Sequence, residues 1–266
     1  MRRTLTFCAL PRVTLPRFTA PDSLRPVIRL SLLGRTDVVD ASGERLDGLV
    51  AQRKRFALLA YLAATARKGF HSRDRLLLMF WPEEDQERAR ASLRKAVHVL
   101  RQALGDGILV SRGDDELGLA PDSLWCDAVA FDEAVEQGKL ARALELYRGD
   151  LLEGFFIPGH GEFEAWMEGE RARLRTVAAR TAWSLADRFE TDRSITMATQ
   201  WARRAAELSG IEDERAVRKV IALLARAGDR AGALATYEAF RKRLATVFEV
   251  TPSKETVELV DGIRRG

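Results

Sequence analysis

The chain has 266 residues, of which 46% are hydrophobic and 31% charged. This composition is typical of a globular protein with one large or two ordinary domains and excludes a disordered chain. Two cysteines and three widely separated histidines provide little for a disulfide framework or a zinc site, so we expect no metal and no other cofactor. No run of about 18 apolar residues occurs, so we expect no membrane span, and the composition favours the cytoplasm.

The charges are distributed unevenly along the chain. Residues 1–121 carry 21 Lys and Arg against 14 Asp and Glu, whereas residues 122–266 carry 22 against 25. A basic first half and a slightly acidic second half indicate that the first half faces nucleic acid.

The first 26 residues contain four of the eight prolines and little periodicity, which predicts a flexible arm. Strands and helices then follow in a definite order up to Pro121, with Ser72 placed to cap the second helix. The predicted elements are a strand at 27–34, an antiparallel pairing of 38–39 with 46–49, helices at 52–69, 73–80 and 85–104, and a hairpin of 108–111 with 116–120.

After Pro121 the pattern is wholly helical, and Asp127 is placed to cap the first of these helices. Gly138–Tyr147 and Gly228–Tyr237 share the pattern G-x4-A-L-x2-Y, in which a small alanine lets two helices approach. The repeat predicts tetratricopeptide-like helical hairpins. The predicted helices span 127–137, 140–147, 162–190, 194–208, 214–227, 231–248 and 253–263.

The helix predicted at 85–104 separates apolar from cationic residues. Leu93, Val97, Leu100 and Leu104 recur at helical spacing and form one apolar stripe. The polar residues lie away from the stripe: Arg88, Lys95, His98 and Gln102 opposite it, and Arg90, Arg94 and Arg101 along one flank. A helix that packs by one face and presents cationic donors on the other suits the major groove of DNA.

The order of these elements, with the basic helix in third place, is that of a winged helix-turn-helix. The sequence resembles the SARP-type family of bacterial transcription activators, which join an OmpR/PhoB-type winged helix to a bacterial transcriptional activator domain. The segments that carry the resemblance are RLSLLG at 29–34, RKRFALLAYL at 53–62, LLLMFWP at 76–82, RASLRKAVHVLRQAL at 90–104, YRGDLLEGF at 147–155, AGDRAGALATYEAF at 227–240 and VFEVTP at 247–252.

The resemblance implies an α+β winged helix-turn-helix at 27–121, followed by an all-α, tetratricopeptide-like activator domain at 122–266. It implies that the chain activates transcription, binds promoter direct repeats in tandem as a homodimer on double-stranded DNA, and contacts RNA polymerase. The implied site residues are Arg88, Arg90, Arg94, Lys95 and His98 toward the bases, Ser72, Arg73, Ser92, Arg101 and Arg112 toward phosphates, and Trp81, Glu83 and Glu84 in a loop facing polymerase.

The wing of this predicted domain, which is the hairpin of 108–111 with 116–120, departs from the family pattern. Asp114, Asp115 and Glu116 are acidic, and Leu117 stands where the family usually has an aromatic residue. An alternative function is therefore a protein-interaction scaffold with a degenerate winged helix. No catalytic motif is present, so we do not expect an enzyme.

Overall fold

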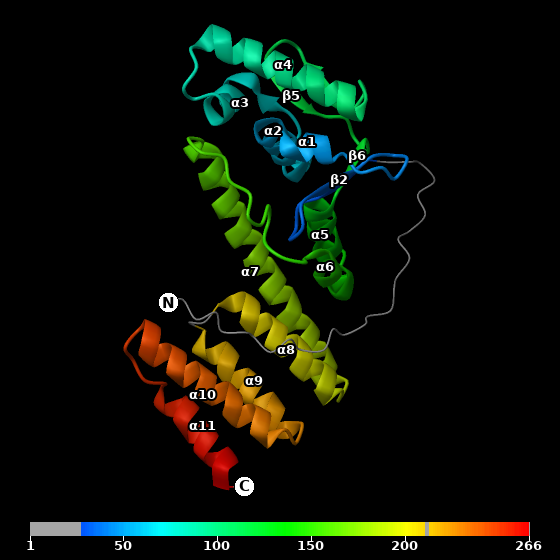
Figure 1. Ribbon diagram of the computed structural model, residues 1–266. Coiled ribbons are helices and arrows are strands. Elements are labelled where there is room, and N and C mark those ends of the chain that lie inside the picture. Colours follow the sequence, from blue (N-terminus) through cyan, green and yellow to red (C-terminus); the bar gives the residue numbers. More distant parts are fainter. Residues whose placement is uncertain (1–27, 211–212, 266) are drawn as a thin grey trace.

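The computed structural model describes residues 28–210 and 213–265, and most of them are helical. Figure 1 shows the N-terminal elements at one end of the molecule and the last four helices at the other, with the long helix α7 (Gly161–Thr191) running between them. The arm expected at residues 1–26 lies outside the described residues. None of the helices described is long and apolar enough to cross a membrane.

The first sheet combines two neighbouring strands with a third from far along the chain. Strand β1 (Ile28–Ser31), predicted from the sequence, pairs antiparallel with β2 (Asp37–Val39) and parallel with β6 (Leu124–Cys126). The expectation of a wholly helical chain after Pro121 is therefore wrong at β6. Three residues are too few for a readable alternation, and their pairing partner is remote in sequence.

The prediction of a strand at 46–49 paired with β2 is also wrong. Only Arg45 bridges to Val39, and the chain turns at once into the short helix α1 (Asp47–Ala51). Leu49, a residue of this helix, is buried, which shows that the apolar side of 46–49 reaches the core through a helical turn.

Asp127 connects this sheet to the helices that follow. Its carboxylate accepts hydrogen bonds from the backbone N–H groups of Leu32, at 2.8 Å, and Leu33, at 3.0 Å. Helix α5 (Asp127–Glu136) consequently starts without a side-chain cap, so the predicted capping role of Asp127 is wrong. Burial raises the pKa of Asp127, while the backbone donors oppose that shift. The end of β1 thus depends on a residue about 95 positions away.

We predict that Asp127→Ala lowers the free energy of unfolding by about 2–4 kcal/mol, because two buried N–H groups lose their acceptor. Urea denaturation of the variant and the parent measures this difference. Asp106→Ala is the control, since Asp106 is exposed and forms no hydrogen bond among the described residues. Equal urea midpoints for the Asp127 and Asp106 variants would refute the role given to Asp127.

The helices near the N-terminus surround a second sheet. Helix α2 (Arg53–Ala64) is followed by the 3-10 turn η1 (Ala66–Lys68) and strand β3 (His71–Ser72), then by α3 (Arg73–Phe80) and α4 (Gln86–Leu104). The predicted hairpin is confirmed as β4 (Leu109–Arg112) with β5 (Glu116–Leu119), and β3 joins it on β5.

Ser72 does not cap α3, contrary to the prediction. It lies in β3 opposite Glu116, and the structure gives its side chain no capping hydrogen bond. The backbone N–H of Arg73 instead donates to the carbonyl of Asp115, at 2.7 Å. The start of α3 is therefore satisfied by the hairpin, which a local capping rule does not consider.

The remaining helices pack in succession. Helix α5 packs with α6 (Leu140–Leu146), α6 with α7, α7 with α8 (Ile195–Ser209), and α8 with α9 (Glu214–Arg226). Helices α10 (Arg230–Val247) and α11 (Lys254–Arg265) complete the chain, and both pack against α9. The alanines and tyrosines of the sequence repeat are buried, as close helix packing requires: Ala143, Tyr147, Ala233 and Tyr237.

Buried apolar residues form two clusters that divide within α7. The first runs from Ile28 to Ala178 and the second from Ala186 to Val260. Aromatic pairs extend the first cluster across residue 121, the predicted end of the first domain. The ring centroids of Phe80 and Phe163 are 5.3 Å apart. Those of Tyr61 and Trp166 are 4.9 Å apart. The N-terminal elements and the first part of α7 therefore share one core.

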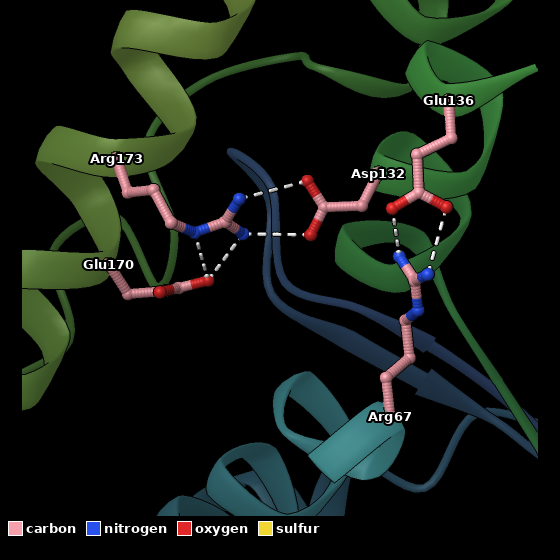
Figure 2. A network of polar contacts seen from close by, with 5 residues as sticks. All are labelled: Arg67, Asp132, Glu136, Glu170 and Arg173. Atoms are coloured by element: carbon pink, nitrogen blue, oxygen red, sulfur yellow. Dashed lines mark hydrogen bonds and ion pairs between the residues drawn. The ribbon is translucent and has the colours of Figure 1, made fainter.

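A polar network reinforces this junction (Figure 2). Arg67 of η1 donates to both carboxylate oxygens of Glu136 on α5, at 2.7 and 2.8 Å. Arg173 of α7 donates to both oxygens of Asp132, at 3.0 and 2.8 Å, and also to Glu170. Two forked arginine–carboxylate pairs thus fix α5 between η1 and α7.

Candidate nucleic-acid interface

Helix α4 has the boundaries and the buried face that its sequence predicts. The Asp85 side chain accepts from the backbone N–H of Arg88 at 3.0 Å, and Gly105 ends the helix with a φ of 105°. The residues of the apolar stripe are all buried, joined by two alanines: Leu93, Val97, Leu100, Leu104, Ala89 and Ala96. One side of α4 is therefore held against the core.

The opposite side of α4 faces solvent. Arg94, Lys95 and His98 are exposed, and among the described residues none of the three forms a hydrogen bond or an ion pair. In Figure 1, α4 lies along the outer edge of its end of the molecule. These three side chains are available to a partner without breaking a contact inside the protein.

Two further arginines predicted at the start of α4 form only exposed ion pairs. Arg88 lies 3.2 Å from Asp85, with 82% of its side chain exposed. Arg90 lies 3.7 Å from Asp74, with 54% exposed. Ion pairs this exposed contribute about 0–1 kcal/mol, so the guanidinium groups can exchange a carboxylate for another anion at little cost.

The residues assigned to phosphates are mostly engaged within the protein. The guanidinium of Arg101 donates twice to the Leu109 carbonyl, at 3.2 and 3.0 Å, and thereby ties α4 to β4. Arg73 donates to the hydroxyl of Ser111 at 2.9 Å. The Ser92 hydroxyl donates to Glu84 at 2.8 Å. Ser72 remains exposed. Sequence reasoning placed Arg73, Ser92 and Arg101 on the right elements but did not foresee their partners.

The arginine of the β4–β5 hairpin, Arg112, is paired within the hairpin itself. Arg112 forms an ion pair with Glu116, and its guanidinium lies 4.8 Å from the centre of the Phe70 ring. The hydrogen bond between the two raises the pKa of Arg112 and lowers that of Glu116. Asp114 and Asp115 are exposed in the turn, so the tip of the hairpin presents acidic groups.

The loop between α3 and α4 separates a buried aromatic residue from exposed acids. Trp81 is 5% exposed, and the ammonium of Lys54 lies 5.7 Å from its ring centre. Glu83 and Glu84 are exposed. Of the loop residues singled out in the sequence, only the glutamates are accessible to a partner, because the indole belongs to the core.

The structure contains one cationic feature, a groove, that the sequence analysis did not predict. A groove of about 440 Å³ lies between the start of α2 and one flank of α4. Its lining residues are Gln52, Lys54, Arg55, Trp81, Ser92, Lys95 and Ala96. The run Arg53–Arg55 in the sequence was a signal for it, but only the packing of α2 against α4 brings Lys54 and Arg55 beside Lys95.

We predict that Arg101→Ala lowers the free energy of unfolding by about 1.5–3 kcal/mol, because the Leu109 carbonyl loses a charged donor. Arg94→Ala is the matched control and should change it by less than about 0.5 kcal/mol, since Arg94 is exposed and unpaired among the described residues. Thermal or urea unfolding of both variants measures the difference. An Arg101 variant as stable as the Arg94 variant would contradict this anchoring role.

The described residues thus combine an exposed cationic helix, held against the core by its other side, with a succession of packed helices. Comparison with known families identifies the class more closely. The model of the bacterial transcriptional activator domain matches residues 126–264, and the chain belongs to this family. The match confirms the resemblance to SARP-type regulators, and this family consists of regulators of transcription rather than enzymes.

A solved structure supports the fold. The chain is similar to Mycobacterium tuberculosis EmbR, solved in complex with a low-affinity phosphopeptide, with a TM-score of 0.53 and 19% identity. The match covers 90% of this chain and 65% of the EmbR chain. A comparison with curated proteins found no match.

Proposed function

We propose that this protein is a sequence-specific DNA-binding regulator that activates transcription. In this proposal residues 27–121 form a winged helix-turn-helix, and α4 is the helix that enters the major groove. The observation that carries the proposal is the exposed, unpaired set of Arg94, Lys95 and His98 on a helix whose other side is buried. Membership of the activator-domain family supports the same function.

The charges of α4 suit two kinds of contact. Lys95 and Arg94 can donate to the guanine edge, and His98 to base acceptors, in a groove wide enough for a helix. Arg88 and Arg90 would contact bases at the start of the helix after exchanging their exposed carboxylate partners. Phosphate contacts supply much of the affinity, so binding should weaken steeply as salt rises.

Whether a residue can also contact a phosphate depends on the partner that it already has in the fold. The residues proposed for phosphate contacts are Ser72, Arg73, Ser92, Arg101 and Arg112. The engaged arginines keep donor atoms beyond those already used, because a guanidinium has five N–H groups. Arg101 would therefore meet a phosphate while it still holds the Leu109 carbonyl. Arg112 also keeps free donors, but Glu116 neutralises part of its charge and the turn beside it is acidic, so we assign the hairpin tip no minor-groove contact.

We predict that Lys95→Ala relaxes the base preference at about one base pair and costs roughly 1–3 kcal/mol of binding free energy at the preferred site. Binding-site selection from random duplexes with the purified full-length protein measures the preference. Lys242→Ala is the matched control, because Lys242 is an exposed lysine on α10. A Lys95 variant that selects the parental site unchanged would exclude Lys95 from base recognition.

We propose further that residues 122–266 act as the activator domain and that the protein binds direct repeats as a homodimer on DNA. The exposed Glu83 and Glu84, in the loop before α4, would then contact RNA polymerase. The loop supports this role because it directly precedes the DNA-facing helix, while the indole of Trp81 anchors it to the core.

We predict that Glu83→Ala reduces activated transcription at least several-fold while the affinity for DNA stays unchanged, since Glu83 forms no hydrogen bond or ion pair among the described residues. Transcription with purified polymerase and a gel shift with the same promoter fragment measure the two properties. Glu44→Ala is the control, because Glu44 is exposed, its side chain forms no hydrogen bond or ion pair among the described residues, and it lies outside the proposed activator domain. Full activation by the Glu83 variant would remove this residue from the polymerase contact.

The acidic tip of the hairpin favours a second function, that of a protein-interaction scaffold that does not bind DNA. Asp114 and Asp115 would repel a phosphate backbone, and Arg112 is engaged by Glu116. Gel shifts of genomic fragments at two salt concentrations separate the functions, because a regulator binds with strong salt dependence and a scaffold does not bind at all.

A further inference from the structure

The groove between α2 and α4 contains two cations, Lys54 and Arg55, that the proposed DNA contacts leave unused. Lys54 and Arg55 reach it from the first turn of α2, and Ser92, Lys95 and Ala96 reach it from α4. At 100° per residue, Ser92 and Ala96 lie on one flank of α4, whereas Arg90, Arg94 and Arg101 lie on the other. The groove is therefore on the flank opposite the hairpin.

The charges around this groove are predominantly positive. It is lined by three cationic side chains and by no carboxylate. Among the described residues, Lys54 and Arg55 form no ion pair: Lys54 lies over the Trp81 ring, and Arg55 donates to the amide oxygen of Gln52. The nearest acid that the contacts identify is Glu84, which accepts from Ser92.

We propose that this groove binds a phosphate of the DNA backbone and forms a second clamp beside α4. The inference rests on the proposed function. A helix in the major groove lies between two sugar-phosphate backbones, about 12 Å apart across the groove. Arg101 on the hairpin flank is the arginine proposed to meet one backbone, and Lys54 and Arg55 supply the cations toward the other.

Continuity favours DNA as the occupant. Lys95 belongs both to the groove and to the solvent-facing side of α4, so an anion in the groove would adjoin the proposed base contacts. A phosphate also fits the donor set, because lysine provides a point charge and arginine a fork of N–H donors. Phosphate contacts are independent of sequence, so this clamp would add affinity without changing the preferred site.

The test compares the full-length parent with the double variant Lys54→Gln, Arg55→Gln. Fluorescence anisotropy with a labelled duplex of mixed sequence gives the binding constant at several salt concentrations between about 50 and 200 mM. The slope of log K against log salt should become shallower by about 1 for the double variant, because one phosphate contact is lost, and by a smaller amount for Arg55→Gln alone. The single variant leaves the contact between Lys54 and Trp81 in place.

The matched control is Lys242→Gln, Arg243→Gln, an adjacent pair of exposed cations on α10, which should keep the parental slope. Circular dichroism and thermal melting establish that each variant is folded. A parental slope in folded variants of the groove overturns this inference alone. The same slope with loss of activated transcription assigns the groove to an acidic segment of polymerase and also overturns it. A parent without salt-dependent binding overturns both this inference and the proposed function.

Discussion

The shared core of the N-terminal elements and the first half of α7 is the constraint on which the rest of the structure depends. The Phe80–Phe163 and Tyr61–Trp166 pairs fill it with aromatic area from α2, α3 and α7. Burial of such side chains stabilises a fold by roughly 1.5–3 kcal/mol each, and the close packing leaves one arrangement of these helices. Because α4 places its leucine stripe on the same core, its cationic side has to face outward.

Polar contacts also join the N-terminal elements to the helices that follow. The N-terminal elements do not hang from a linker, because Asp127 holds the end of β1 and the network of Arg67, Glu136, Asp132 and Arg173 holds α5 (Figure 2). The first hairpin of the activator domain is therefore part of the base on which α4 rests. The second apolar cluster begins only after the middle of α7, so the later helices form a separately packed group.

Some arginines and lysines of the chain already have partners within the fold, and others have none among the described residues. Arg101 and Arg112 have partners within the fold, and their charges are partly used in holding the hairpin. Arg94 and Lys95 have no such partner among the described residues. A charge without an internal partner keeps its full attraction for an external anion, so exposure together with pairing is a better guide to the interface than charge alone.

The sequence by itself determined the longer helices, the hairpin and the two faces of α4, because these follow from periodicity and end signals within about 20 residues. Leu93 and Lys95 could be assigned to opposite sides of α4, and Gly105 to its end, without any tertiary information. Only the tertiary structure decided the strand β6, the role of Asp127 and the partners of Arg101. It also brought Lys54 beside Lys95. The physical reason is that these features are contacts between elements, whose partners are set by how the chain packs and leave no local pattern.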